Sequence, residues 1–122
     1  MPLILHLTPA AYFNALPPGA PYLPAAYPQD GFIHCTKEPE VMLNIANRFY
    51  KDLLGELLVL VIDTDRVTSE VKWEAPAHPY GSAPRPGEAA HQFPHIYGSL
   101  NRDAIIEIHP AHRAPDGAYI SV

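Results

Sequence analysis

Alternating apolar positions predict the first two strands of this chain. In residues 3–7 every second side chain is leucine, so His6 lies on the face opposite the leucines. Residues 31–36 begin at a turn glycine and alternate in the same way. Because successive strand residues point to opposite faces, the neighbours His34 and Cys35 cannot work as a local pair.

An unbroken apolar run predicts the centre of the sheet. Residues 57–62 are apolar on both faces and stop at an Asp-Thr-Asp turn, as a central buried strand would. Residues 71–74 and 105–109 alternate like further strands, and order resumes between them over residues 93–98. We expect 105–109 to be the last strand and the tail from Pro110 to be irregular.

Two segments carry helical signals. Thr8 fits the N-cap and Pro9 the first position of a helix that we expect to continue to Leu16. Pro39 fits the first turn of a second helix, in which apolar residues recur with helical spacing up to about Tyr50. This second segment has the clearest helical pattern in the chain.

Two other stretches predict connections. Residues 17–30 are rich in proline, tyrosine and alanine, which favours an extended, aromatic-lined connection that could form the wall of a pocket. Residues 75–92 form a long proline-rich loop without periodicity, and a structureless stretch of this length is usually functional or mobile.

Length and composition favour one α+β domain over residues 1–122. The chain has 122 residues, of which 48% are hydrophobic and 17% charged, enough apolar surface for one core and too few charges for disorder. Strands outnumber the two helices in this pattern. We therefore predict a single mixed β-sheet with two short-to-medium helices.

Charge narrows the class of partner. Eight basic and thirteen acidic residues give a net charge of -5 with no cluster of Lys and Arg, so no nucleic-acid-binding patch is evident. A small-molecule or nucleotide ligand stays open, because single arginines can oppose the net charge locally. The oligomeric state is left open as well.

Cysteine content and hydropathy bear on the compartment. Cys35 is the single cysteine, so no intramolecular disulfide can form, which favours a reducing compartment. The longest apolar run is far shorter than the roughly 20 residues that a membrane helix needs. We therefore expect a cytoplasmic protein that does not span a membrane.

The seven histidines supply the candidate chemistry. Four of them fall on predicted strands, namely His6, His34, His95 and His109. Imidazole donates and accepts hydrogen bonds near neutral pH, which suits substrate binding, acid–base work or metal ligation. A turn glycine and an aromatic residue frame both His34 and His95, which favours a functional role for these two. For His109 we expect a structural role.

Glu74 and Tyr97 are placed to join them. Glu74 ends a strand just before the proline-rich loop, where a carboxylate could act as a base, although a solvated strand end is the alternative. Tyr97 follows His95 by two residues and shares its face if the segment is extended. It could contact a ligand or pack in the core.

The sequence lacks the usual motifs of a metal site, a cysteine nucleophile and a glycine-rich nucleotide-binding loop. No HxH or HExxH motif supports a metal site from the scattered histidines and Glu74, so we predict no metal ligand. Cys35 has no base on its own face, which predicts a buried structural thiol. Neither a Rossmann nor a Walker glycine motif is present, so a bound nucleotide must be held in another way.

Several motifs together resemble the family catalogued as domain of unknown function 952. They are Leu5-His6-Leu7-Thr8, Asp30-Gly31-Phe32-Ile33-His34-Cys35-Thr36, the strand up to Asp63, Trp73-Glu74 and Phe93-Pro94-His95-Ile96-Tyr97-Gly98. That family resembles the ADP-ribosyltransferase-like fold group, whose enzymes bind NAD in a cleft of a split β-sheet. The resemblance therefore implies a split sheet and an NAD-related site.

The resemblance also implies roles for single residues. By their order in the chain, His6 and His34 match the positions that bind the ribose and flank the nicotinamide. Thr36 and Tyr97 join them as candidates for substrate binding.

Glu74 and His95 are the candidates for catalysis. A carboxylate or a neutral imidazole near the ribose C1 would stabilise an oxocarbenium-like state and orient the acceptor. The leading hypothesis is an NAD- or ADP-ribose-handling transferase, with NAD as a substrate. The alternatives are a non-enzymatic small-molecule binding module and a metal-dependent hydrolase.

Overall fold

The computed structural model describes residues 3–52, 55–74 and 93–121. Its elements are β1 (Leu3–Pro9), α1 (Ala10–Ala15), α2 (Tyr27–Asp30), β2 (Ile33–His34), α3 (Pro39–Phe49), β3 (Leu57–Asp63), β4 (Glu70–Glu74), β5 (Phe93–Tyr97), β6 (Ile105–Pro110), β7 (His112–Arg113) and β8 (Tyr119–Ser121). Short 3₁₀ turns precede β4 and β6. The fold is α+β, as the sequence pattern predicts.

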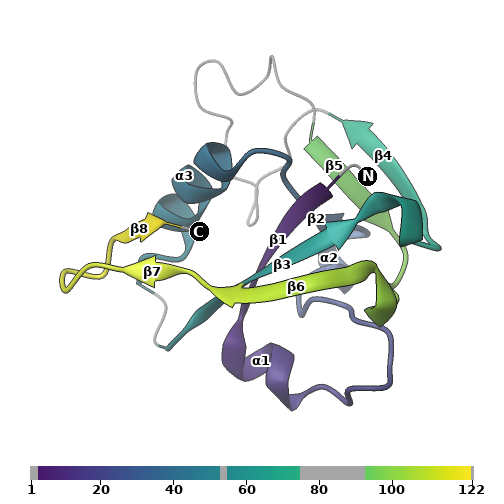
Figure 1. The fold of residues 1–122 in the computed structure, drawn as a ribbon, viewed down its shortest axis with the longest axis horizontal. Coiled ribbons are helices and arrows are strands. Elements are labelled where there is room, and N and C mark those ends of the chain that lie inside the picture. Colours follow the sequence, from purple (N-terminus) through teal and green to yellow (C-terminus); the bar gives the residue numbers. More distant parts are fainter. Residues whose placement is uncertain (1–2, 53–54, 75–92, 122) are drawn as a thin grey trace.

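The described strands form three small antiparallel sheets. Their orders are β1-β3-β6, β2-β5-β4 and β7-β8. In Figure 1 the β1-β3-β6 sheet crosses the middle of the molecule, with the β2-β5-β4 sheet toward one end and α3 with β7-β8 toward the other. The prediction of one mixed sheet is wrong. A mixed sheet needs a helical connection between two parallel strands of the same sheet, whereas α1 and α3 each connect strands that belong to different sheets.

Two backbone hydrogen bonds join the two larger sheets. The N–H of Leu5 in β1 donates to the Thr36 carbonyl at 2.7 Å, and the N–H of Thr36 donates to the Leu5 carbonyl at 2.8 Å. The strand predicted over 31–36 is therefore divided. Ile33 and His34 pair with β5, whereas Thr36 pairs with β1.

β3 is buried along its whole length, which confirms its prediction as the central strand of its sheet. The face that carries Leu60 packs against α1 and residues of β2 and β5. The opposite face, which carries Val59, packs against α3 and β8. Burial on both faces is the reason that an apolar residue occupies every position from 57 to 62.

α3 confirms the second predicted helix, with Pro39 at its start and Met42 and Ala46 buried. The side-chain amide of Asn47 donates to the Tyr119 carbonyl at 2.9 Å and accepts from the Tyr119 N–H at 2.7 Å. The Asn47 side chain thus pairs with the backbone N–H and C=O of Tyr119, as a neighbouring strand would. They attach β8 to the helix.

The first helix begins later than predicted. β1 continues through Thr8 and Pro9, which pair with Leu58 and Leu57 of β3, so Thr8 is not an N-cap and α1 begins at Ala10. The sheet ladder satisfies the backbone here and overrides the local capping signal. The stretch 17–30 also differs from prediction, because it contains the short helix α2.

The tail beyond Pro110 is ordered, contrary to prediction. β7 and β8 form a hairpin whose turn includes Gly117 at φ 93°. Arg113 donates to the carbonyls of Gly55 and Lys51 and lies over the Tyr119 ring. Contacts with residues far away in the sequence therefore order a segment that has little local pattern.

Cys35 is 2% exposed, and its thiol donates to the Ile33 carbonyl at 3.8 Å. Burial raises the pKa of this thiol, so it is protonated at neutral pH. The predicted proline-rich loop at 75–92 lies outside the described residues. Within the described part of the chain, no helix is long and apolar enough to cross a membrane.

Gly98, at the end of β5, should tolerate no side chain. Its φ is 139°, and a Cβ there would lie 2.5 Å from Ser69 Oγ. Gly98→Ala should lower the free energy of unfolding by about 2 kcal/mol, measured by urea denaturation. Gly19→Ala is the matched control, because a Cβ at Gly19 meets nothing within 4 Å. Equal stability of the two variants would contradict the strain.

Candidate functional site

The pairing of β2 with β5 brings His34 and His95 together. These residues lie directly opposite each other in the antiparallel register, and their ring centroids are 5.7 Å apart. Both side chains project from the same face of the sheet, since directly paired residues share a face. Each ring is held by a different carboxylate.

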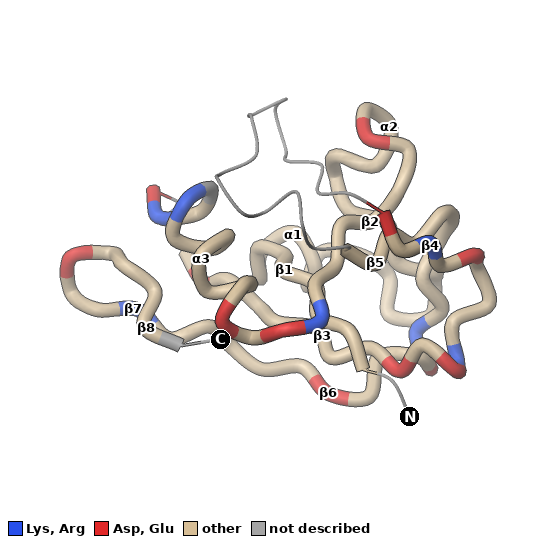
Figure 2. Tube along the Cα trace, turned by 90° about the horizontal axis from the view of Figure 1, so that it is seen from above, with Lys and Arg blue, Asp and Glu red and all other residues tan. Residues whose placement is uncertain are grey.

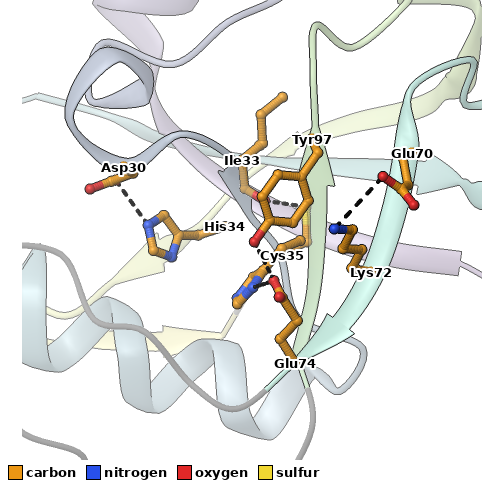
Figure 3. Close-up of polar contacts among 9 residues, drawn as sticks. Asp30, Ile33, His34, Cys35, Glu70, Lys72, Glu74 and Tyr97 are labelled. Carbon is orange, nitrogen blue, oxygen red and sulfur yellow. Dashed lines mark hydrogen bonds and ion pairs between the residues drawn. The ribbon is translucent and has the colours of Figure 1, made fainter.

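Glu74 holds His95 from the neighbouring strand β4. Nδ1–H of His95 donates to Glu74 Oε1 at 2.9 Å, and the Tyr97 hydroxyl donates to the same oxygen at 2.6 Å. Figure 3 shows Tyr97 and Glu74 meeting beside β5. The hydrogen bonds from Tyr97 and His95 lower the pKa of Glu74, so it is a carboxylate at neutral pH.

His95 is a neutral imidazole at neutral pH. Its side chain is 3% exposed, and burial lowers its pKa despite the bond to Glu74. With Nδ1 donating to the carboxylate, Nε2 carries the lone pair. Among residues 3–52, 55–74 and 93–121, no group hydrogen-bonds to Nε2, which leaves that nitrogen available as a base.

Asp30 holds His34 in a similar way. Nε2 of His34 lies 2.9 Å from Asp30 Oδ2, at the C-terminal end of α2 (Figure 3). Gly31 follows in the left-handed conformation with φ 79°, and this turn leads the chain from α2 into β2. In the neutral ring Nε2–H donates to Asp30, and Nδ1 carries the lone pair.

Phe32 packs against both histidines. Its ring stacks on His95 with centroids 4.2 Å apart and an interplanar angle of 28°, and its centroid is 4.7 Å from that of His34. Tyr97 also contacts Phe32, at 5.3 Å between centroids. The aromatic contacts restrict the rotamers of the two imidazoles, which is what a positioned acid–base pair requires.

His6 differs from the other two histidines because both of its ring nitrogens are engaged. Nδ1–H donates to the His34 carbonyl at 2.6 Å, and Nε2 accepts from the Tyr22 hydroxyl at 2.8 Å. Burial lowers the pKa of His6 to about 4, so the ring is neutral.

A cavity of about 230 Å³ opens beside these groups. The three histidines His6, His34 and His95 line it together with Asp30 and Thr36. The rest of its described lining is mostly apolar or aromatic and includes Tyr12, Tyr22, Met42, Ile45 and Tyr50. A concave, largely apolar site with a few convergent polar groups is the usual form of a small-molecule site.

The structure brings four of the six predicted site residues to this cavity, namely His6, His34, Thr36 and His95. Glu74 and Tyr97 are not among its described lining residues, but they contact His95 or its carboxylate partner. Their roles in binding or catalysis stay predictions.

Sequence reasoning missed Asp30, Phe32 and Tyr22. Asp30 precedes a turn glycine and lies four residues before His34, a spacing that could have suggested a partner for the imidazole. Phe32 shares a strand face with His34, so its contact was accessible from alternation alone. Tyr22 has no local signal, because its contact with His6 depends on the tertiary fold.

The described lining of the cavity contains neither basic side chains nor an arrangement that could hold a metal ion. None of the described residues that line the cavity is Lys or Arg. Figure 2 shows basic residues scattered singly over the described elements. Within the described part of the chain, no group of three or more His, Cys, Asp or Glu side chains is placed to hold a metal ion.

Comparisons with known proteins identify a family and a fold. The family model described as "Protein of unknown function (DUF952)" matches residues 7–108. The crystal structure of protein CC0527 from Caulobacter crescentus has a TM-score of 0.73 and 22% identity, over 97% of this chain and 93% of that chain. Its solution NMR structure has a TM-score of 0.67 and 23% identity, over 96% and 90%. No curated protein matches the sequence.

Protonation of His6 should destabilise the fold in acid. In the unfolded chain His6 takes up a proton near the ordinary histidine pKa of 6.5, whereas in the folded protein its pKa is about 4. The unfolded state therefore binds more protons between these values, and stability falls as the pH drops through that window. The contribution of His6 is complete above pH 6.5 and is on the order of 3 kcal/mol.

Urea denaturation from pH 7.5 to 4 would measure this slope, with His6→Asn as the comparison. The asparagine amide can still donate to the His34 carbonyl but does not titrate. The variant should lose stability less steeply with falling pH, whatever its stability at pH 7. An unchanged slope would show that other groups cause the acid destabilisation.

Proposed function

The chain belongs to the DUF952 family, and we propose that it is a transferase that acts on NAD or ADP-ribose. The observation that carries the proposal is the Glu74–His95 pair. One nitrogen of a neutral, nearly buried imidazole binds a carboxylate, and the ring lines a cavity of about 230 Å³. This is the arrangement of a general base whose tautomer is fixed by its partner.

His34 would bind the ribose of the substrate, the role that the resemblance assigns to His6, because both ring nitrogens of His6 are already engaged. With Nε2–H donating to Asp30, Nδ1 of His34 can accept a hydrogen bond from a ribose hydroxyl. His34 and His95 lie opposite each other, so a sugar held by one lies within reach of the other. His6 would act differently from the other two. Its nitrogens are engaged internally, and it supports the carbonyl of His34 through a hydrogen bond.

The reaction follows from these positions. The lone pair of His95 Nε2 takes the proton of an acceptor hydroxyl, and the oxygen forms a bond to the ribose C1. The C1–N bond breaks, and its electron pair neutralises the pyridinium ring of the departing nicotinamide. The new imidazolium is stabilised by the Glu74 carboxylate at 2.9 Å from Nδ1.

The size of the cavity limits what it encloses. Sites that enclose a drug-sized ligand usually measure roughly 300–1,000 Å³. A cavity of about 230 Å³ fits a nucleoside-sized portion of a dinucleotide. The resemblance of the sequence motifs to the ADP-ribosyltransferase-like group supports the nicotinamide end as that portion.

Loss of the base should strongly reduce turnover without loss of the fold. His95→Ala should reduce nicotinamide release from NAD by about 10²- to 10⁴-fold, the usual contribution of a general base. His109→Ala is the control, since His109 is half-buried on β6 and is not among the described lining residues. Chromatography of released nicotinamide measures both. Full turnover by His95→Ala would refute the assigned role.

Glu74→Gln should weaken the base without removing it. The amide cannot stabilise the imidazolium, so we expect about a 10- to 100-fold lower rate and little change in KM. Tyr97→Phe keeps the carboxylate and should have the smaller effect. NAD that raises the melting temperature without any nicotinamide release by the native protein would instead indicate a binding module.

A further inference from the structure

His34 is a second imidazole that is equipped for proton transfer. In the proposed transferase reaction only His95 moves a proton, because the departing nicotinamide needs none. His34 nevertheless has the same construction, since one ring nitrogen lies 2.9 Å from the Asp30 carboxylate and no described residue hydrogen-bonds to the other. The transferase reaction therefore leaves an oriented proton donor of the site unused.

The free nitrogens of both rings are open to the cavity. Within the described part of the chain, Thr36 Oγ1 is the one sealed side-chain nitrogen or oxygen that lacks a hydrogen-bond partner. Nδ1 of His34 and Nε2 of His95 also lack a partner among those residues, so both atoms retain accessible surface. Because both rings line the cavity, a small molecule there can contact both nitrogens.

The surroundings of the two rings differ in a way that assigns them different roles. Burial lowers the pKa of His95, and a positive charge on His34 would lower it further. The side chain of His34 is 26% exposed, and the Asp30 carboxylate stabilises its protonated form. A single proton on the pair therefore belongs to His34, which makes His34 the acid and His95 the base.

The two rings lie on the same side of any substrate. They are directly paired across β2 and β5, project from one face of the sheet, and have centroids 5.7 Å apart. An in-line displacement needs its attacking and leaving atoms on opposite sides of the reacting centre. Two imidazoles on one side fit instead two oxygens bonded to the same carbon, each about 2.8 Å from its own nitrogen.

Charge and lining restrict the molecule that carries those oxygens. The described lining contains the Asp30 carboxylate and neither Lys nor Arg, so an anion would lose its hydration without meeting a fixed cation. Tyr12, Tyr22 and Tyr50 supply aromatic surface, on which the apolar face of a sugar ring can pack. A neutral monosaccharide in its cyclic form meets these restrictions. Its anomeric carbon carries two oxygens, the hydroxyl and the ring oxygen.

We propose that the cavity interconverts the anomers of a neutral monosaccharide, with His34 and His95 as the acid–base pair. Nε2 of His95 takes the proton of the anomeric hydroxyl, and the electron pair of that O–H bond forms the C1=O double bond. The bond from C1 to the ring oxygen breaks, and the ring oxygen keeps its electron pair and takes the proton from Nδ1 of His34. After rotation about C1–C2 the ring closes on the other face of the carbonyl, and each proton returns to its starting nitrogen. This activity goes beyond the proposed transferase, since it needs neither NAD nor a leaving group.

Polarimetry of freshly dissolved α-D-xylose and α-D-glucose tests the activity. The native protein should accelerate the mutarotation of at least one sugar by about 10²-fold or more over free imidazole at equal concentration. His34→Gln and His95→Gln should each remove the acceleration, because an amide can hydrogen-bond but cannot carry the proton. His109→Ala is the control and should keep the native rate, since His109 is not among the described lining residues. A native protein no faster than imidazole, or either glutamine variant at the native rate, would overturn the proposal.

The pH dependence of the native rate tests the pair without any substitution. The profile should be bell-shaped, because two neutral rings supply no acid and two protonated rings supply no base. A rate that rises with pH to a plateau would indicate a single base and contradict the pair. The other titratable or charged groups around the two rings are His6 on β1, Asp30 on α2, Lys72 and Glu74 on β4 and Tyr97 on β5. Burial lowers the pKa of His6 to about 4, and the hydrogen bond between Tyr97 and Glu74 lowers the pKa of Glu74 and raises that of Tyr97, so these three do not titrate near neutral pH.

A non-reacting sugar and a parallel assay separate this activity from the transferase. Methyl β-D-xyloside lacks the anomeric proton, so it should inhibit the mutarotation without itself changing anomer, and a lack of inhibition would contradict binding in the cavity. Nicotinamide release from NAD is measured on the same preparation. Mutarotation without nicotinamide release would contradict the transferase and support the acid–base pair. Nicotinamide release without mutarotation would overturn the pair and leave the transferase standing.

Discussion

The site depends on the place where the two larger sheets meet. The reciprocal hydrogen bonds between Leu5 and Thr36 fix β1 against the end of the β2 segment. A side-chain bond, from His6 to the His34 carbonyl at 2.6 Å, reinforces the same junction. Because His34 and Thr36 lie on either side of Cys35, this junction determines where the imidazole and the hydroxyl lie. The cavity is lined by residues from both sheets.

The three histidines of the cavity differ in how many ring nitrogens the protein occupies. His6 has both nitrogens bound, whereas a carboxylate binds one nitrogen of His34 and one of His95. A ring with both nitrogens bound is a structural member of a polar network, and burial lowers its pKa and keeps it neutral. A ring with one nitrogen bound is oriented but still chemically competent. The hydrogen-bond partners of the ring nitrogens therefore distinguish His6 from His34 and His95, although all three are histidines that line the cavity.

Much of the fold follows from patterns that are local in the sequence. The apolar run at 57–62 and the helical spacing from Pro39 can be recognised without knowing which elements pack against these two segments. The choice of strand partners depends on contacts distant in sequence, so the mixed sheet was predicted in error. For the same reason the C-terminal hairpin was missed, since Asn47 and Arg113 order it through distant contacts.

The candidate site divides in the same way. Strand alternation was enough to predict that His34 and Cys35 point to opposite faces, and only His34 of the two belongs to the carboxylate-held pair. The hydrogen bond between Tyr22 and His6 needed the tertiary structure, because Tyr22 lies in the connection between α1 and α2 and no local pattern links it to β1.

The burial of Cys35 has a practical consequence for spectroscopic studies of the dynamics of this protein. The chain contains one cysteine, and that thiol is buried and held in its unreactive protonated form. A cysteine introduced at an exposed position would therefore be the one thiol open to maleimide reagents in the folded protein. A fluorophore or spin label can be attached beside the cavity without first removing the native residue, so the protein is suited to single-site spectroscopy as it stands.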